Sequence, residues 1–164
     1  MPAPANQDEL LNEKIPSLYD FSHFNKIVDV GGGHGGLIIS ILKANPQAFG
    51  VLVDAEEVIA GARPKLETAG IADRCAAVAG DFFESVPCSG DAYIMNRIIH
   101  DWDDERAIRI LTNCRARQPQ RVIIVDSRER TAKEIDELLA AAGLRLRRLI
   151  PTDLRTSIIE AEPQ

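Results

Sequence analysis

The 164-residue chain has the length of one domain of ordinary size and can bury a core without disulfides or a structural metal. Apolar residues make up 45% and charged residues 27%, a mixture that is unlike that of a disordered or membrane-spanning chain. The formal net charge of -6 and the pI near 5.1 argue against a nucleic-acid partner, because phosphate backbones attract clustered Lys and Arg.

The N-terminal segment is rich in Pro, Ala and polar residues and is expected to lead into a short helix at 8–18. We therefore divide the chain into a lead-in with a short helix, residues 1–18, and a domain formed by residues 19–164. The segment has no apolar run of signal-peptide length and no basic flank, which predicts a cytoplasmic protein. The widely spaced cysteines are expected to be reduced and to form neither a disulfide framework nor a zinc site: Cys75, Cys88 and Cys114.

Apolar, β-branched runs then alternate with segments of helical periodicity. This alternation predicts βαβ units and an α/β fold with a parallel, doubly wound sheet. The five predicted strands lie at 26–30, 49–55, 75–80, 91–96 and 121–126, and the helices between them at 36–44, 56–70 and 103–115.

The C-terminal part has a different pattern. A helix at 131–143, closed by Gly143, is followed by strands at 144–150 and 154–162. Residues 151–153 form a short turn between these strands, which predicts that they pair antiparallel. The alternating arginines of the first strand are expected on the solvent side of an edge strand: Arg145, Arg147 and Arg148.

A glycine-rich loop, residues 29–36, follows the first strand and opens a helix. Its glycines let the backbone approach a ligand closely, and the helix N-terminus offers unpaired N–H groups. Asp54 ends the second strand, where a carboxylate can accept hydrogen bonds from ribose hydroxyls. The loop also fits the dinucleotide fingerprint, so alone it leaves NAD and S-adenosylmethionine open as cofactors.

Later motifs favour the second cofactor. GDFFESVP at 80–87 and YIMNRIIHDWDDERA at 93–107, together with VDVGGGHGG at 28–36, resemble the class I S-adenosylmethionine-dependent O-methyltransferases of plant phenolics and bacterial polyketides. The resemblance covers residues 19–162. It implies a Rossmann-like, doubly wound sheet of seven strands in the order 3-2-1-4-5-7-6, with the last strand antiparallel.

The resemblance also implies a cofactor site. Asp54, at the end of the second strand, is implied to bind the ribose, and Asp81 and Phe82 of the GDFF motif are implied to bind adenine. The glycine loop is implied to lie beside the methionine portion. A carboxylate can accept the amino hydrogen of adenine, and an aromatic face can stack on the base. Asn96 stands where relatives often have Lys. The implied cofactor-binding residues are Asp29, Gly31, Gly33, Asp54, Asp81, Phe82 and Asn96.

Methyl transfer requires an aligned and deprotonated acceptor, and His100 is the candidate base. It follows the fourth strand, where open α/β sheets bind ligands. By the resemblance, Asp126 stands where a Glu often assists the base, and it is the second candidate catalytic residue. The acids after His100 are expected to cap a helix, and no metal site is predicted.

The resemblance carries differences that affect function. Relatives have a large N-terminal helical domain, which dimerises and forms much of the acceptor pocket, and a longer segment after the fifth strand. We therefore expect a monomer or weak dimer, without nucleic-acid or membrane partners, that slowly methylates a phenolic hydroxyl of a small molecule. Two other interpretations stay open: a cofactor-binding domain with little or no turnover, and an NAD-dependent oxidoreductase.

Overall fold

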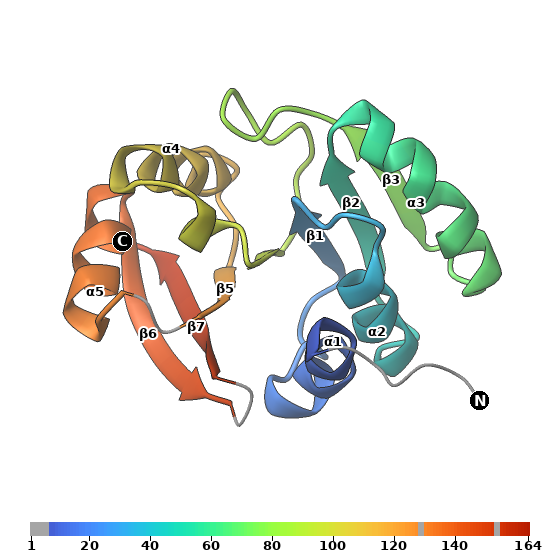
Figure 1. Ribbon diagram of the computed structural model, residues 1–164, viewed down its shortest axis with the longest axis horizontal. Helices are drawn as coiled ribbons and strands as arrows, with labels where there is room; N and C mark the ends of the chain where they lie inside the picture. Colours follow the sequence, from blue (N-terminus) through green and yellow to red (C-terminus); the bar gives the residue numbers. More distant parts are fainter. Residues whose placement is uncertain (1–6, 128–129, 153–154) are drawn as a thin grey trace.

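The computed structural model describes residues 7–127, 130–152 and 155–164 (Figure 1). Its strands form one seven-stranded sheet in the order β3-β2-β1-β4-β5-β7-β6. The first five strands are parallel, and β7 runs antiparallel to both of its neighbours. The predicted fold class and strand order are therefore confirmed. The strands are β1 Lys26–Val30, β2 Phe49–Asp54, β3 Cys75–Ala79, β4 Ala92–Asn96, β5 Arg121–Ser127, β6 Leu144–Pro151 and β7 Thr156–Pro163.

Helices cover both faces of the sheet, which explains why the central strands read as continuous apolar runs. Side chains that alternate along β1 enter different cores: Ile27 packs with α1, α2 and α3, whereas Val28 packs with α4 and α5. Figure 1 shows α4 and α5 together on one side of the molecule. The helices are α1 Gln7–Leu18, α2 Gly36–Ala44, α3 Glu56–Thr68, the short 3-10 helix η1 Ile99–Asp101, α4 Asp104–Arg115 and α5 Ala132–Ala141.

The first helix is part of the packed structure. Leu11 and Ile15 of α1 are buried in the same core as the side chains of α2. The division of the chain at residue 18 stays a prediction. Within the described residues, no helix combines the length and the apolar character needed to cross a membrane.

The C-terminal hairpin differs in detail from the sequence-based prediction. β6 is the edge strand, as expected, but a bulge between Leu146 and Arg148 breaks the alternation. Arg147 and Arg148 are consequently both exposed. Pro151, predicted in the turn, is the last residue of β6, and the predicted turn and strand residues 153–154 lie outside the described residues.

Candidate active site

The register of the parallel strands brings the predicted site residues to one edge of the sheet. Val30 pairs with Val53, Asp54 pairs with Ala79, and Asn96 pairs with Val125. The carboxyl ends of β1 to β5 therefore lie side by side. Ligands of open α/β sheets bind at this edge, outside the carboxyl ends of the strands.

Asp54 holds the glycine loop in place. The backbone N–H of Gly33 donates to Asp54 Oδ2 at 2.9 Å, and that of Ala55 donates to Oδ1 at 2.7 Å. Gly33 has a φ of 61°, in the left-handed region that favours glycine. Because an ionised carboxylate has about four acceptor positions, Asp54 can hold the loop and still accept hydrogen bonds from a ligand.

Asp29, at the end of β1, is a buried carboxyl group without a hydrogen-bond partner among the described residues. Its burial, and secondly the negative charge of Asp54, raises the pKa of Asp29 to about 7. An unpartnered buried acid gains most from a cationic group placed beside it. This observation fits the amino group and sulfonium of S-adenosylmethionine.

A cavity of about 500 Å³ continues from Asp54 to the GDFF segment. Asp54 and Asp81 both line it, together with the rings of Phe82 and Phe83. Asp81 Oδ1 accepts from the backbone N–H of Phe83 at 2.9 Å, and Asn113 donates to the carbonyl of Phe82 at 2.8 Å. Acids and aromatic rings in one cavity suit a nucleoside, which presents hydroxyl groups, an amino group and a flat base.

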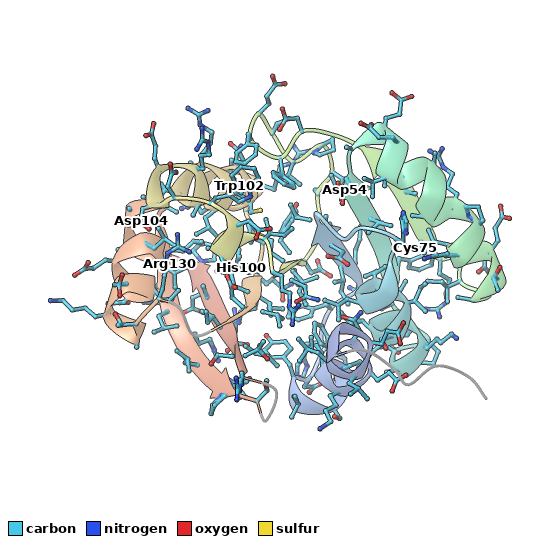
Figure 2. All side chains as sticks on the ribbon, viewed as in Figure 1. Asp54, Cys75, His100, Trp102, Asp104 and Arg130 are labelled. Carbon is cyan, nitrogen blue, oxygen red and sulfur yellow. The ribbon has the colours of Figure 1, made fainter. Side chains whose placement is uncertain are left out.

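His100 lies in η1, which begins three residues after the end of β4 (Figure 2), and its ring contacts two carboxylates. Its Nδ1 is 2.6 Å from Asp126 Oδ1 on β5, and its Nε2 is 3.1 Å from Asp101 Oδ1. Asp126 is buried, whereas 60% of the Asp101 side chain is exposed. The structure thus brings together the two residues predicted to be catalytic.

Two of the acids that follow His100, Asp103 and Asp104, have partners within the protein. Asp103 caps α4 by accepting from the backbone N–H of Arg106 at 2.9 Å, as the sequence predicts. Asp104 forms an ion pair with Arg130. Among the residues that the structure describes, no group of three or more His, Cys, Asp and Glu side chains is arranged to hold a metal ion.

Asn96, at the end of β4, contacts the first helix. Its side-chain nitrogen donates to Asn12 of α1 at 3.2 Å, and its oxygen is buried without a partner among the described residues. The predicted cofactor residue is therefore positioned by a helix to which the sequence assigned no chemistry.

Sequence reasoning missed Asn12, Asn113 and Arg130 at this site. The two asparagines act through a single hydrogen bond each, and neither belongs to a motif. Arg130 is one of many arginines in the chain, and only its position in the fold distinguishes it. No periodicity or spacing pattern would have identified these three residues.

Comparison with known proteins agrees with this geometry. A family profile described as the O-methyltransferase domain matches residues 1–127. The chain is 37% identical to a phenazine O-methyltransferase of Lysobacter antibioticus, over 98% of this chain and 55% of the relative. It is 33% identical to a phenazine-1-carboxylate N-methyltransferase of Pseudomonas aeruginosa, over 90% of this chain and 52% of the relative.

A solved structure gives the same result in three dimensions. CalO1, a methyltransferase of calicheamicin biosynthesis in its S-adenosylhomocysteine-bound form, superimposes with a TM-score of 0.88 at 34% identity. The match covers 96% of this chain and 54% of CalO1, so the chain spans about half the length of the relatives it matches. Profile, sequence identity and superposition agree, and the chain belongs to the O-methyltransferase domain family.

Proposed function

We propose that this chain binds S-adenosylmethionine at the carboxyl edge of its sheet and transfers the methyl group to a hydroxyl of an aromatic small molecule, with His100 as the general base. The observation that carries the proposal is the contact between His100 Nδ1 and Asp126, 2.6 Å apart, at the carboxyl edge of the sheet. A general base must be held in position to remove a proton from the acceptor, and a buried carboxylate hydrogen-bonded to a histidine ring does this.

S-adenosylmethionine is the cofactor of the family, and the site has the groups to hold it. Asp29 would face the cationic methionine end, Asp54 would accept from the ribose hydroxyls, and Asp81 and Phe82 would hold adenine. When bound, the cofactor supplies a methyl group already activated by positively charged sulfur. The protein has to align the acceptor and remove its proton.

His100 performs the second task through its ring nitrogens. Asp126 accepts the Nδ1 proton of the neutral ring, which leaves a lone pair on Nε2. The exposed Asp101 carboxylate rotates away from Nε2, and the acceptor hydroxyl takes its place. With the cofactor bound, Nε2 would accept the hydroxyl proton as the acceptor oxygen takes up the methyl group. Asp126 stabilises the imidazolium that results.

The test replaces His100 by Ala. We expect kcat on phenolic acceptors to fall by about 10²-fold or more, while affinity for S-adenosylhomocysteine stays nearly unchanged. The matched control is His23→Ala, since His23 is 76% exposed and its contact is Asp20. Equal turnover by wild type and His100→Ala would remove His100 as the base. Loss of turnover with a chelator would point to a metal requirement instead.

A nitrogen acceptor is the second candidate, because one relative is a phenazine-1-carboxylate N-methyltransferase. A ring nitrogen with a free lone pair can be methylated without losing a proton, so His100→Ala would then leave kcat within about threefold of wild type. Parallel assays with a phenol and with an N-heteroaromatic acid separate the two acceptors.

Calorimetry separates the remaining alternatives. Titration with S-adenosylhomocysteine and with NAD should show tighter binding of the former. Preference for NAD would favour the oxidoreductase interpretation. Cofactor binding without methylation of any phenol or N-heteroaromatic acid in a broad panel would favour the binding-domain interpretation.

A further inference from the structure

Arg130 lies between β5 and α5, and its guanidinium contacts the segment that carries His100. Nη1 donates to the carbonyl of Ile99 at 3.0 Å, and Nη2 donates to the carbonyl of Trp102 at 2.8 Å. Only 16% of the Arg130 side chain is exposed. Because these carbonyls lie on either side of His100 and Asp101, one side chain holds both ends of the segment.

The same guanidinium forms an ion pair with Asp104, the first residue of α4. Asp104 Oδ1 lies 3.2 Å from Nε and 3.1 Å from Nη2. Figure 2 shows Arg130 and Asp104 near each other, next to His100. Three acceptors on Ile99, Trp102 and Asp104 thus fix the orientation of a planar, rigid donor group.

The backbone hydrogen bonds within the segment around His100 are long, although the side chain of Ile99 is buried in the core. η1 is a single turn, and its backbone hydrogen bonds, Asp101 N to Ile98 O and Trp102 N to Ile99 O, are both 3.3 Å long. These distances exceed the usual range for N–H···O bonds, and short 3-10 turns have poor hydrogen-bond geometry. The burial of Ile99 and the packing of Trp102 on Phe83 hold the side chains of this segment, and the shorter hydrogen bonds from Arg130 hold its backbone carbonyls.

We infer that Arg130 is a positioning residue, which fixes the backbone on both sides of His100 so that the ring keeps the orientation set by Asp126. The inference rests on the proposed function, since it takes His100 as the base. Two residues would then fix the position of His100. Asp126 on β5 contacts its ring, and Arg130 contacts the main chain on both sides of it.

The test compares Arg130→Met and Arg130→Lys with wild type. The primary measurement is the tautomer of His100 at pH 8, read from ¹⁵N chemical shifts of the ring nitrogens and assigned by their loss in His100→Gln. We expect Nδ1 of wild type to be protonated, as its contact with Asp126 requires, and Arg130→Met to show a mixture that includes rings protonated on Nε2 alone. Its kcat on a phenol should fall between about tenfold and about a hundredfold, with affinity for S-adenosylhomocysteine changed by less than about twofold.

Two controls separate positioning from general stability. Arg130→Lys keeps a charge beside Asp104 but lacks the fork that reaches both carbonyls, so its ring spectrum should resemble that of Arg130→Met while its thermal stability stays closer to wild type. Arg106→Met removes an arginine that pairs with Asp103 and lies over Trp102, and its ring spectrum should match that of wild type.

A wild-type tautomer in both Arg130 variants would overturn the inference. If Arg130→Met does not fold, the spectrum of Arg130→Lys decides. If wild type binds cofactor but methylates nothing, the proposed function fails, whereas the ring spectra still test the contact between Arg130 and the His100 segment. A tautomer shift without any change in kcat would overturn the positioning role.

Discussion

Asp126 contacts His100 Nδ1 from a position that is only 3% exposed. Replacement by Asn keeps the shape but removes the charge that, in the proposed mechanism, would stabilise the imidazolium and select the tautomer. We predict that Asp126→Asn lowers kcat by about 10²-fold or more while S-adenosylhomocysteine binds with unchanged affinity. Steady-state assays and calorimetry check this, with Asp136→Asn on the exposed side of α5 as the control. Full activity of Asp126→Asn would mean that the carboxylate does not assist the base.

Asp29 is expected to make the folded protein less stable as the pH rises. An acid in an ion pair does the opposite, because its pKa is lowered. Burial in the folded protein raises the pKa of Asp29 from its ordinary value of 3.8 to about 7. The folded protein therefore holds a proton that the unfolded chain loses, and its free energy of unfolding falls as the pH rises from about 4 to about 7. Asp29→Asn removes this dependence, so the variant should exceed wild type in stability at pH 8 by on the order of 3 kcal/mol and differ less at pH 5.

Urea unfolding of both proteins at pH 5 and pH 8 measures this difference. Identical pH dependence would show that Asp29 does not titrate on folding as proposed. The ammonium group of S-adenosylhomocysteine beside Asp29 would favour the ionised carboxylate, so binding near pH 7 should release protons in wild type but not in Asp29→Asn. Calorimetry in buffers with different ionisation enthalpies detects that release.

At the scale of elements, the turn from β1 into α2 depends on contact between segments. A Cβ added at Gly31 would lie 2.5 Å from Ile98 Cδ1 and 3.0 Å from Phe82 Cε2, at a φ of 70°. We predict that Gly31→Ala destabilises the fold by about 2–4 kcal/mol and weakens S-adenosylhomocysteine binding at least about tenfold, because the loop and the Phe82 ring must move apart.

Gly70 supplies the matched control. It also has a positive φ, 77°, but no atom lies within 4 Å of an added Cβ. Gly70→Ala therefore bears the backbone strain without the collision and should lose only about 1 kcal/mol, with cofactor affinity intact. Equal losses of affinity in the two variants, measured by calorimetry, would contradict a role for close approach at Gly31.

The strands β1 to β5 could be predicted because their apolar runs and the helical segments between them follow different periods. The position of β7 between β5 and β6 came from the family resemblance, since periodicity does not give strand order. The bulge at Leu146 has no glycine or other local signal.

Asp54 and His100 stand out in motifs, whereas Arg130 acts through backbone carbonyls, which every residue has. Contacts of that kind depend on the tertiary fold and leave no pattern in the sequence.

At the scale of the molecule, one contact joins the segment that follows α1 to the C-terminal hairpin. The hydroxyl of Tyr19, which follows α1, donates to Glu160 of β7, and Glu160 also pairs with Arg148 at 3.2 Å. Glu160 is only 4% exposed, so loss of a donor leaves a buried charge less well paired.

We predict that Tyr19→Phe lowers the free energy of unfolding by about 1–3 kcal/mol, since one hydrogen bond to a charged, buried acceptor disappears. Far-UV circular dichroism and the fluorescence of Trp102, excited where tyrosine does not absorb, should report the same unfolding transition. Its midpoint should lie at a lower denaturant concentration than in wild type. Cofactor affinity should not change, because Glu160 pairs in register with Ile123, near the amino end of β5. Unchanged stability would show that the hydrogen bond contributes nothing net.

The sheet order also has a consequence for synthesis on the ribosome. Of the strands described in this sheet, β7 comes after all the others in the chain, yet it lies inside the sheet, between β5 and β6. Until residues 156–163 leave the exit tunnel, the nascent chain holds β5 as an open edge with unpaired N–H and C=O groups. Such edges pair readily with other chains. Aggregation during translation is therefore a hazard specific to this topology, and protection of β5 by chaperones would matter most in the interval before the last strand arrives.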